Sequence, residues 1–232
     1  MRHKQSDEFI KLYKKMAARH GYSGIWNDFI QIFACSLSNA IDKSRKEQRM
    51  KSVEDVMRVY NQEELALFVK MMELTSIAIK EEPDQDFLGE LYHALELHKK
   101  QVGQFFTPYN VSKMMALMNL RDPSEEIREK GFISINDPCC GGGAMLIAAA
   151  NVCREKDIDI GKDILFVAQD LDPLVAKMCY IQLCLLGCAG YVLIGNSLFS
   201  EEVQESNTWL LPKLFQQAWL DRGVIYKPDA SA

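Results

Sequence analysis

Residues 136–146 read Asn136-Asp137-Pro138-Cys139-Cys140-Gly141-Gly142-Gly143-Ala144-Met145-Leu146, and this stretch decides the fold because it joins a strand to a helix through three glycines. The apolar residues Phe132, Ile133 and Ile135 before it predict a short buried strand, so Asp137 stands at a strand's carboxyl end, where open parallel sheets bind ligands. Glycine has no Cβ, and the main chain of Gly141–Gly143 can therefore adopt positive φ and lie directly against a ligand. The helix expected over Ala144–Arg154 points its amino terminus into the same space. Three glycines also occur in ordinary flexible loops, but the strand–loop–helix context favours a small-molecule site.

A second strand end carries two aspartates. Ile164–Ala168 is a strand-like run that continues into Gln169-Asp170-Leu171-Asp172-Pro173 and then into a long apolar helix over Leu174–Leu186. A carboxylate at the tip of the second strand can accept hydrogen bonds from both hydroxyls of a ribose. Capping of the following helix is the other role for these acids, and Asp172, with proline next to it, fits that role. This assignment leaves Asp170 for the ribose.

A third strand, Tyr191–Ile194, is followed by Gly195 and Asn196. The Asn196 amide either bonds the amino group of an adenine or forms a turn with Gly195. Three strand ends that carry Asp137, Asp170 and Asn196 in sequential order favour a nucleoside-containing ligand over three unrelated loops.

Four segments together resemble one known family. Residues 103–108 read GQFFTP, and about thirty residues later come DPCCGGGAML, then QDLDPLVAKMCYIQLCLLG and GNSL. This series resembles the adenine-specific DNA methyltransferases of the type I restriction–modification M-subunit kind, over roughly Asp86–Leu198. The resemblance implies an α/β, truncated Rossmann-like S-adenosylmethionine-dependent methyltransferase fold preceded by an all-α helical domain. GQFFTP paired with the glycine loop is specific, although neither half is specific alone.

The resemblance also implies a cofactor site for S-adenosylmethionine. Phe106, Thr107 and Pro108 match the element that lies against the methionine part of the cofactor, and Asp137 with Gly141, Gly142 and Gly143 matches the loop beneath that part. Asp170 matches the ribose acid and Leu171 the apolar residue beside the adenine, while Asn196 stands where the family usually has an aspartate that accepts from the adenine amino group. An amide oxygen can still accept that bond. At Gly142 the family usually has serine or threonine, so one hydroxyl contact is lost.

The family's catalytic tetrapeptide, Asn/Asp-Pro-Pro-aromatic, is absent from this sequence. Every Asp-Pro, at Asp122, Asp137 and Asp172, is followed by Ser, Cys or Leu, and the sequence contains no Asn-Pro. The tetrapeptide holds the amino group of the target adenine during methyl transfer, so the resemblance predicts cofactor binding without a catalytic residue in this chain.

Composition describes a folded protein with little affinity of its own for DNA. The 232 residues are 48% hydrophobic, enough for a sizeable core. A formal charge of −5 argues against a strong stand-alone duplex binder, and the basic run Lys43–Lys51 is interpreted as a solvated helix end. No apolar stretch predicts a membrane span or a signal peptide, so we expect a cytoplasmic protein. Seven cysteines without zinc-type spacing predict no metal site and fit a reducing compartment.

The chain is predicted to divide near residue 100, into a helical domain (1–100) and a methyltransferase-like domain (101–232). Helices are expected over Ser6–Arg19, Trp26–Lys46, Asn61–Lys80 and Asp86–His98. After residue 100, strands and helices alternate as in a parallel sheet with helices on both faces, and the last expected elements are a helix over Trp209–Leu220 and a strand over Gly223–Tyr226.

The resemblance further implies that the strand before the glycine loop lacks its usual neighbour. An apolar strand with an open edge invites pairing, either with the carboxyl-terminal segment or with another chain. We therefore expect a homo-oligomer or a hetero-complex, with DNA and partner subunits as the family's partners.

Three functions from different classes follow. The first is an S-adenosylmethionine-binding protein that methylates DNA adenine once the missing tetrapeptide is supplied elsewhere. The second is a non-catalytic binding or regulatory module of a restriction–modification system. The third, an NAD-type dinucleotide enzyme, is disfavoured because the loop lacks G-x-G-x-x-G spacing and GQFFTP has no role there.

Overall fold

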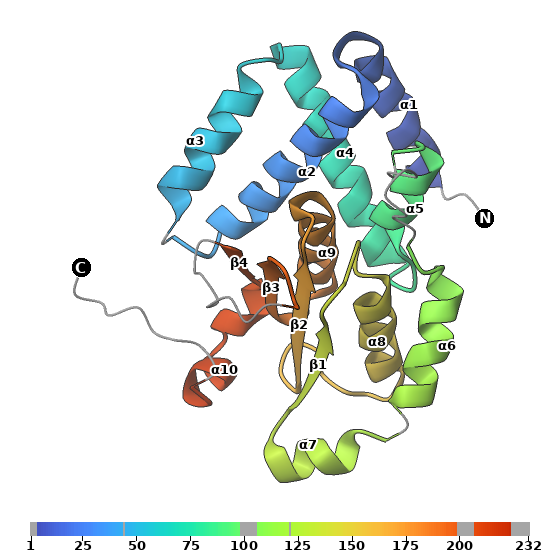
Figure 1. Ribbon diagram of the computed structural model, residues 1–232, viewed down its shortest axis with the longest axis vertical. Coiled ribbons are helices and arrows are strands. Elements are labelled where there is room, and N and C mark those ends of the chain that lie inside the picture. Colours follow the sequence, from blue (N-terminus) through green and yellow to red (C-terminus); the bar gives the residue numbers. More distant parts are fainter. Residues whose placement is uncertain (1–3, 44, 98–105, 121, 199–206, 224–232) are drawn as a thin grey trace.

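A computed structural model of the chain describes residues 4–43, 45–97, 106–120, 122–198 and 207–223. Seven α-helices of the described residues precede an open α/β sheet in the chain, and the first five lie on one side of the molecule with the sheet and its covering helices on the other (Figure 1). The expected architecture, a helical region followed by an α/β sheet, is confirmed. The helices before the sheet are α1 (Lys4–His20), α2 (Tyr22–Asn39), α3 (Lys46–Met57), α4 (Gln62–Glu81) and α5 (Phe87–Ala94), followed by α6 (Tyr109–Asn119) and α7 (Ser124–Lys130).

Aromatic side chains build the core of the helical region. Phe9 of α1 packs edge-on against Phe29 of α2, with ring centroids 5.2 Å apart, and Trp26 of α2 contacts both Phe9 and Tyr92 of α5. The expected start of α4 is confirmed, because the Asn61 side chain accepts from the Glu64 amide while the Glu64 carboxylate accepts from the Asn61 amide, both at 2.9 Å.

The helix expected over Trp26–Lys46 is wrong at both ends. Helix α2 begins at Tyr22 and stops at Asn39, and a separate helix, α3, starts at Lys46. Lys46–Lys51 of the basic run thus form the start of a new helix, not a helix end. Arg49 in this run is buried and ion-paired with Asp42 at 2.6 Å, which explains why the run is not simply solvated.

Four strands form one sheet in the order β1-β2-β3-β4. Their bounds are β1 (Ile133–Asp137), β2 (Ile164–Asp170), β3 (Ala189–Ile194) and β4 (Thr208–Leu210), and helices α8 (Ala144–Glu155) and α9 (Pro173–Leu186) connect the first three. Strands β1, β2 and β3 are parallel, and β4 runs antiparallel to β3. The register sets Asp137 beside Ala168 and Asp170 beside Ile194, so the strand ends meet at one edge as expected.

The two faces of the sheet are covered differently. Phe166 and Ala168 point into the large core that also contains α8 and α9, whereas Leu165 points to the other face and packs with Leu214 and Trp219. This alternation is the two-residue period of a strand. Leu214 and Trp219 belong to a 3₁₀ helix (Pro212–Phe215) and to α10 (Gln217–Asp221).

The continuous helix expected over Trp209–Leu220 is wrong. Trp209 pairs with Val192 of β3 as part of β4, and the 3₁₀ helix starts at Pro212. A proline inside the predicted helix would remove a backbone donor and clash with the preceding turn, so the segment breaks there. The strand expected over Gly223–Tyr226 lies, apart from Gly223, outside the described residues.

Strand β1 lies at the end of the sheet, so the expected open edge is confirmed for the described residues. The division of the chain near residue 100 stays a prediction. Among the described helices, none has the length and apolar character needed to cross a bilayer, and no group of three metal-type ligands occurs in the same residues.

Candidate functional site

The glycine loop leaves β1 at Asp137 and enters α8 at Ala144. The Asp137 carboxylate accepts from the Cys139 amide at 3.2 Å, and Cys140 donates its amide to the carbonyl of Gln169 at 2.9 Å. Gly141 and Gly143 adopt φ values of 51° and 98°, which L-residues with side chains rarely take. A Cβ on Gly143 would also lie 2.8 Å from the Cys179 Sγ, so this glycine is required by packing as well as by conformation.

Asp170 holds the loop in place. Its Oδ2 accepts from the Gly141 amide at 2.8 Å and its Oδ1 accepts from the Asp172 amide at 2.9 Å. The sequence suggested that this carboxylate is free for a ligand, but in the structure it already accepts hydrogen bonds from two backbone groups. Each carboxylate oxygen keeps a lone pair for a ligand. The capping role expected for Asp172 is confirmed, since its side chain accepts from the Leu174 amide at 2.9 Å with Pro173 at the first helical position.

Phe106 lies between the helical region and the glycine loop. Its ring stacks on Tyr92 of α5 with centroids 5.5 Å apart, and it forms a T-shaped pair with His93, with centroids 5.2 Å apart. The same ring lies 3.3 Å from the position that a Cβ on Gly141 would occupy. The segment that matches GQFFTP thus contacts the glycine loop directly; residues 103–105 of that segment are outside the described part of the chain.

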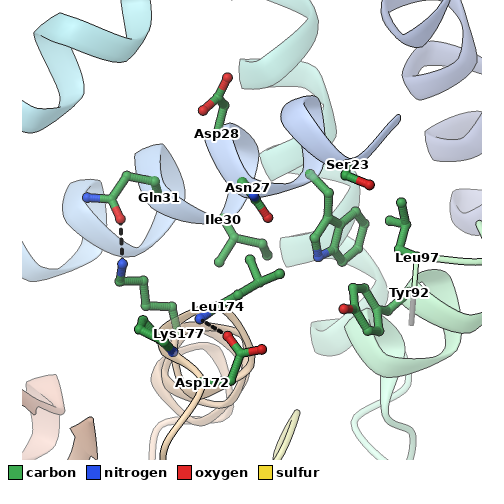
Figure 2. A pocket seen from close by; sticks show the side chains of 12 residues that line it. Ser23, Asn27, Asp28, Ile30, Gln31, Tyr92, Leu97, Asp172, Leu174 and Lys177 are labelled. Atoms are coloured by element: carbon green, nitrogen blue, oxygen red, sulfur yellow. Dashed lines mark hydrogen bonds between the residues drawn. The ribbon is translucent and has the colours of Figure 1, made fainter. Parts of the chain in front are cut away.

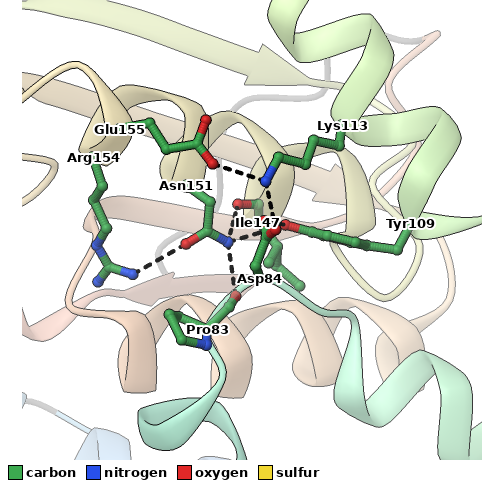
Figure 3. Close-up of polar contacts among 8 residues, drawn as sticks. All are labelled: Pro83, Asp84, Tyr109, Lys113, Ile147, Asn151, Arg154 and Glu155. Carbon is green, nitrogen blue, oxygen red and sulfur yellow. Dashed lines mark hydrogen bonds and ion pairs between the residues drawn. The ribbon is translucent and has the colours of Figure 1, made fainter. Parts of the chain in front are cut away.

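A polar network fixes the segment after Phe106 against α8 (Figure 3). Tyr109 donates its hydroxyl hydrogen to Asp84 at 2.7 Å, and Lys113 is ion-paired with both Asp84 and Glu155. Asn151 of α8 donates to the Pro83 carbonyl at 2.7 Å and to the Tyr109 hydroxyl at 3.1 Å. Because α8 begins at the glycine loop, these bonds connect the segment after Phe106 to the helix that follows the loop.

A cavity of about 240 Å³ opens over the loop and unites most of the predicted residues. Its lining consists of Phe106, Thr107, Asp137, Cys139, Cys140, Gly141, Gly142, Ala144, Met145, Asp170 and Val175. Four predicted residues do not line it. Pro108 caps α6, Gly143 packs on Cys179, Leu171 is 67% exposed, and the Asn196 side chain accepts from the Leu198 amide at 3.0 Å as in a turn. The roles assigned to Leu171 and Asn196 beside an adenine stay predictions.

The lining of this cavity is acidic. Asp137 and Asp170 are its charged residues, and no Lys or Arg is among the described residues that line it. Burial raises the pKa of Asp137, the hydrogen bond from Cys139 opposes that shift, and the charge of Asp170 adds to it. A cationic ligand would relieve the repulsion between the two carboxylates, and a ligand with hydroxyl groups would find acceptors on both.

A larger cavity, of about 460 Å³, lies elsewhere, between α2, the end of α5 and the start of α9 (Figure 2). Its polar lining includes Lys177, which donates to the Gln31 amide oxygen at 2.6 Å, and Asp172, whose carboxylate caps α9. The glycine loop does not contribute to this cavity. We therefore place the candidate site in the smaller cavity, where two strand ends, the glycine loop and two carboxylates meet.

Sequence reasoning missed several residues of the site. Met145 and Val175 occupy the first turns of α8 and α9, and their position directly after the two loops was a usable signal. Two other residues had no signal in the sequence, because they reach the site from distant segments. Tyr92 stacks on Phe106, and Gln182 donates to the Gly142 carbonyl of the loop.

The comparisons with known proteins identify the family of the chain. Residues 83–212, more than half of the chain, match the N-6 DNA methylase family, and the chain belongs to that family. The family expected from GQFFTP and the glycine loop is thus confirmed, and the dinucleotide-enzyme alternative is not supported.

Two known proteins are similar to this chain. The methylase subunit of the type I restriction enzyme MjaIX from Methanocaldococcus jannaschii is 26% identical over 131 residues, which make up 54% of this chain and 22% of that subunit. The chain therefore spans about a fifth of the length of this relative. A crystal structure of a protein described as a putative class I S-adenosylmethionine-dependent methyltransferase, from Listeria monocytogenes, shares 16% identity with a TM-score of 0.48, over 86% of this chain and 56% of that protein.

Proposed function

We propose that this chain binds S-adenosylmethionine in the cavity over the glycine loop and serves as the cofactor-binding part of a DNA adenine N6-methyltransferase. The observation that carries the proposal is the cavity itself, in which Phe106, the glycine loop, Asp137 and Asp170 come together from segments far apart in the sequence. Membership of the N-6 DNA methylase family supports the reaction type.

The chemistry of the cavity suits this cofactor. S-adenosylmethionine carries a positive sulfonium and a positive amino group, and the cavity presents two carboxylates. The remaining lone pairs of Asp170 would accept from the ribose hydroxyls, and Phe106 with Thr107 would lie against the methionine part. Ligand pockets usually enclose roughly 300–1,000 Å³. At about 240 Å³ the cavity holds part of the cofactor, and we propose that the adenine extends toward Leu171 and Asn196.

Methyl transfer would need a group from outside these 232 residues, supplied by a further carboxyl-terminal portion or by a second polypeptide. The 232 residues contain no Asn/Asp-Pro-Pro-aromatic tetrapeptide to hold a target adenine. The same observation favours a second candidate, a module that binds the cofactor within a restriction–modification complex without catalysing transfer. Both candidates share the cofactor site, and they differ in whether transfer appears when a partner is added.

Calorimetric titration with S-adenosylmethionine and with S-adenosylhomocysteine tests the shared site. We expect micromolar dissociation constants for the chain and loss of binding in Asp170→Ala. Glu125→Ala, at an exposed acid of α7 far from the loop, is the matched control and should bind normally. Normal binding by Asp170→Ala would exclude the proposed site.

Transfer of labelled methyl groups to duplex DNA then separates the two candidates. The isolated chain should transfer none, and transfer by it alone would show that the missing tetrapeptide is not needed. Transfer that appears when the product of the neighbouring open reading frame is added supports split catalysis. Binding that persists without transfer in that mixture supports the non-catalytic module.

We also propose that the protein works with partner subunits and DNA. The similar protein from Methanocaldococcus jannaschii is a methylase subunit of a type I restriction enzyme. The formal charge of −5 gives this chain little electrostatic attraction for DNA on its own. The open edge of β1 is the proposed contact, between copies of the chain or with another subunit. Multi-angle light scattering should detect an oligomer or a complex; a strict monomer that also fails to bind a partner would contradict this proposal.

A further inference from the structure

Gln182 is a buried amide in the middle of the otherwise largely apolar helix α9, with 1% of its surface exposed. Its Nε2 donates to the carbonyl of Gly142 at 2.9 Å and to the Asp86 Oδ1 at 2.7 Å. Its Oε1 accepts from the Leu88 amide at 3.1 Å. Both amide hydrogens and the amide oxygen are thus bonded, as a buried amide requires.

These bonds join the glycine loop to the helical region. Asp86 caps α5 by accepting from the Gly89 amide at 3.0 Å, and Leu88 lies in the first turn of the same helix. Gln182 therefore connects Gly142, in the loop, with the amino terminus of α5, which lies more than fifty residues earlier in the chain. Helix α5 also carries Tyr92, which stacks on Phe106 at the cavity wall.

The peptide group between Gly142 and Gly143 is fixed at both of its polar atoms. Its carbonyl accepts from Gln182, and its N–H, which belongs to Gly143, donates to the Cys140 carbonyl at 2.8 Å. The peptide group is planar, so rotating the carbonyl away from Gln182 also turns the N–H away from Cys140 and opens the loop. Gly142 is buried, and loss of the Gln182 donor would remove the side-chain hydrogen bond that its carbonyl accepts.

From this geometry we infer that Gln182 is a positioning residue of the cofactor site, which sets the conformation of the glycine loop through the Gly142 carbonyl. The inference rests on the proposed function in that the ligand is taken to be S-adenosylmethionine. Gln182 does not line the cavity, so its effect on binding passes through the loop.

Gln182→Glu is the test variant. Glutamate keeps an acceptor for Leu88 but, when ionised, has no hydrogen for Gly142 and faces the buried Asp86 carboxylate, whose pKa burial already raises. Protonated glutamate regains one donor. His93 of α5 and Cys179 of α9 are the other titratable groups that act on Asp86, and both are present unchanged in every variant.

Gln85→Glu is the matched control. Gln85 is also buried and also donates two hydrogen bonds to carbonyls, those of Ala78 at 3.1 Å and Glu82 at 2.7 Å, but it has no bond to the loop. A purely structural effect of a buried carboxylate should therefore appear in both variants as a lower melting temperature. An effect on the loop should appear in Gln182→Glu alone.

The measurements are calorimetric titration with S-adenosylhomocysteine at pH 8 and at pH 5.5, and hydrogen exchange of the Gly143 amide in the ligand-free proteins. We expect Gln182→Glu to bind at least about tenfold more weakly than the unchanged chain at pH 8. The deficit should shrink at pH 5.5, and Gly143 exchange should be faster. Gln85→Glu should match the unchanged chain in affinity and in exchange. If Gln182→Glu does not fold, Gln182→Glu combined with Asp86→Asn replaces it, because the asparagine removes the facing charge.

The inference would be overturned if Gln182→Glu and Gln85→Glu had the same affinity, relative to the unchanged chain, at both pH values. A Gly143 exchange rate that is the same in both variants would also overturn it. If the unchanged chain binds neither S-adenosylmethionine nor its product, the proposed function fails, and the exchange measurement still decides whether Gln182 sets the loop.

Discussion

Gly143→Ala and Gly142→Ala should change the free energy of unfolding in opposite directions, although the two glycines are adjacent and nothing in the sequence distinguishes them. Gly143 has a φ of 98°, and a Cβ there would lie 2.8 Å from the Cys179 Sγ. Gly142 has an ordinary φ, and its nearest neighbour to a Cβ would be the Phe106 ring at 3.4 Å, which is normal contact. Alanine is therefore strained at the first position and fits the second.

The magnitudes follow from these two environments. A left-handed backbone costs an alanine about 1–2 kcal/mol, and overpacking against the buried Cys179 costs about 1–3 kcal/mol more. The loss of glycine freedom in the unfolded chain returns about 0.4–1 kcal/mol. We expect Gly143→Ala to lower the free energy of unfolding by about 2–4 kcal/mol. Gly142→Ala should raise it by up to about 1 kcal/mol, since only the unfolded-state term applies.

Urea unfolding followed by tryptophan fluorescence measures both values, because the three tryptophans are buried. Adding Cys179→Ala to Gly143→Ala should recover the packing part of the loss and leave the backbone part. Gly142→Ser, which restores the residue type that the family usually has, should be tolerated and should bind S-adenosylmethionine at least as tightly as the unchanged chain. Equal stability of Gly143→Ala and Gly142→Ala would refute the reasoning about the loop.

Three further outcomes are expected. Binding of the cationic S-adenosylmethionine should tighten as pH rises through the raised pKa of Asp137, because the bound cation favours the ionised carboxylate. Binding should therefore release a proton, which calorimetry in buffers of different ionisation enthalpy detects. The variant Asp137→Asn should release no such proton. The raised pKa has the reverse effect on the free protein, whose stability from this group is full below the unfolded pKa of about 4 and is lost as pH rises through the folded value. Asn61→Ala removes the capping box of α4 with Glu64 and should reduce the free energy of unfolding by about 1 kcal/mol in a thermal melt, while affinity for the cofactor stays unchanged. Cys139, the exposed cysteine at the cavity, should react first with a thiol reagent and be protected by S-adenosylhomocysteine, whereas fast labelling of the buried Cys179 would contradict the described packing.

Local features of the site could be read from the sequence, but the contacts that complete it could not. Asp172 before Pro173 predicts a helix cap because both residues act within one turn, and the structure has that cap. Asp170 looked free for a ribose because its bond to Gly141 spans 29 residues. The bond from Gln182 to Asp86 spans 96 residues, and no periodicity or spacing encodes such a pair.

In the carboxyl-terminal part, distant contacts also decided a feature that the sequence did not predict. Trp209 lies in an apolar stretch that suits a helix by composition, but its pairing with Val192 and its position beneath the cations of Arg49 and Lys177 make it a strand residue. Tertiary contacts outweigh local preference there. Pro212 is a local signal for the break, because proline cannot continue a helix without losing a backbone hydrogen bond.

The terminal position of β1 means that the wall of the cavity beside Asp137 ends where the sheet ends. If the cavity binds S-adenosylmethionine as proposed, a polypeptide that extended the sheet at this strand would set its own side chains next to the methyl donor and would complete the chamber from outside. Under that arrangement, reactivity toward a base would arise only in the assembled particle, and an unassembled copy would hold its cofactor without modifying DNA indiscriminately.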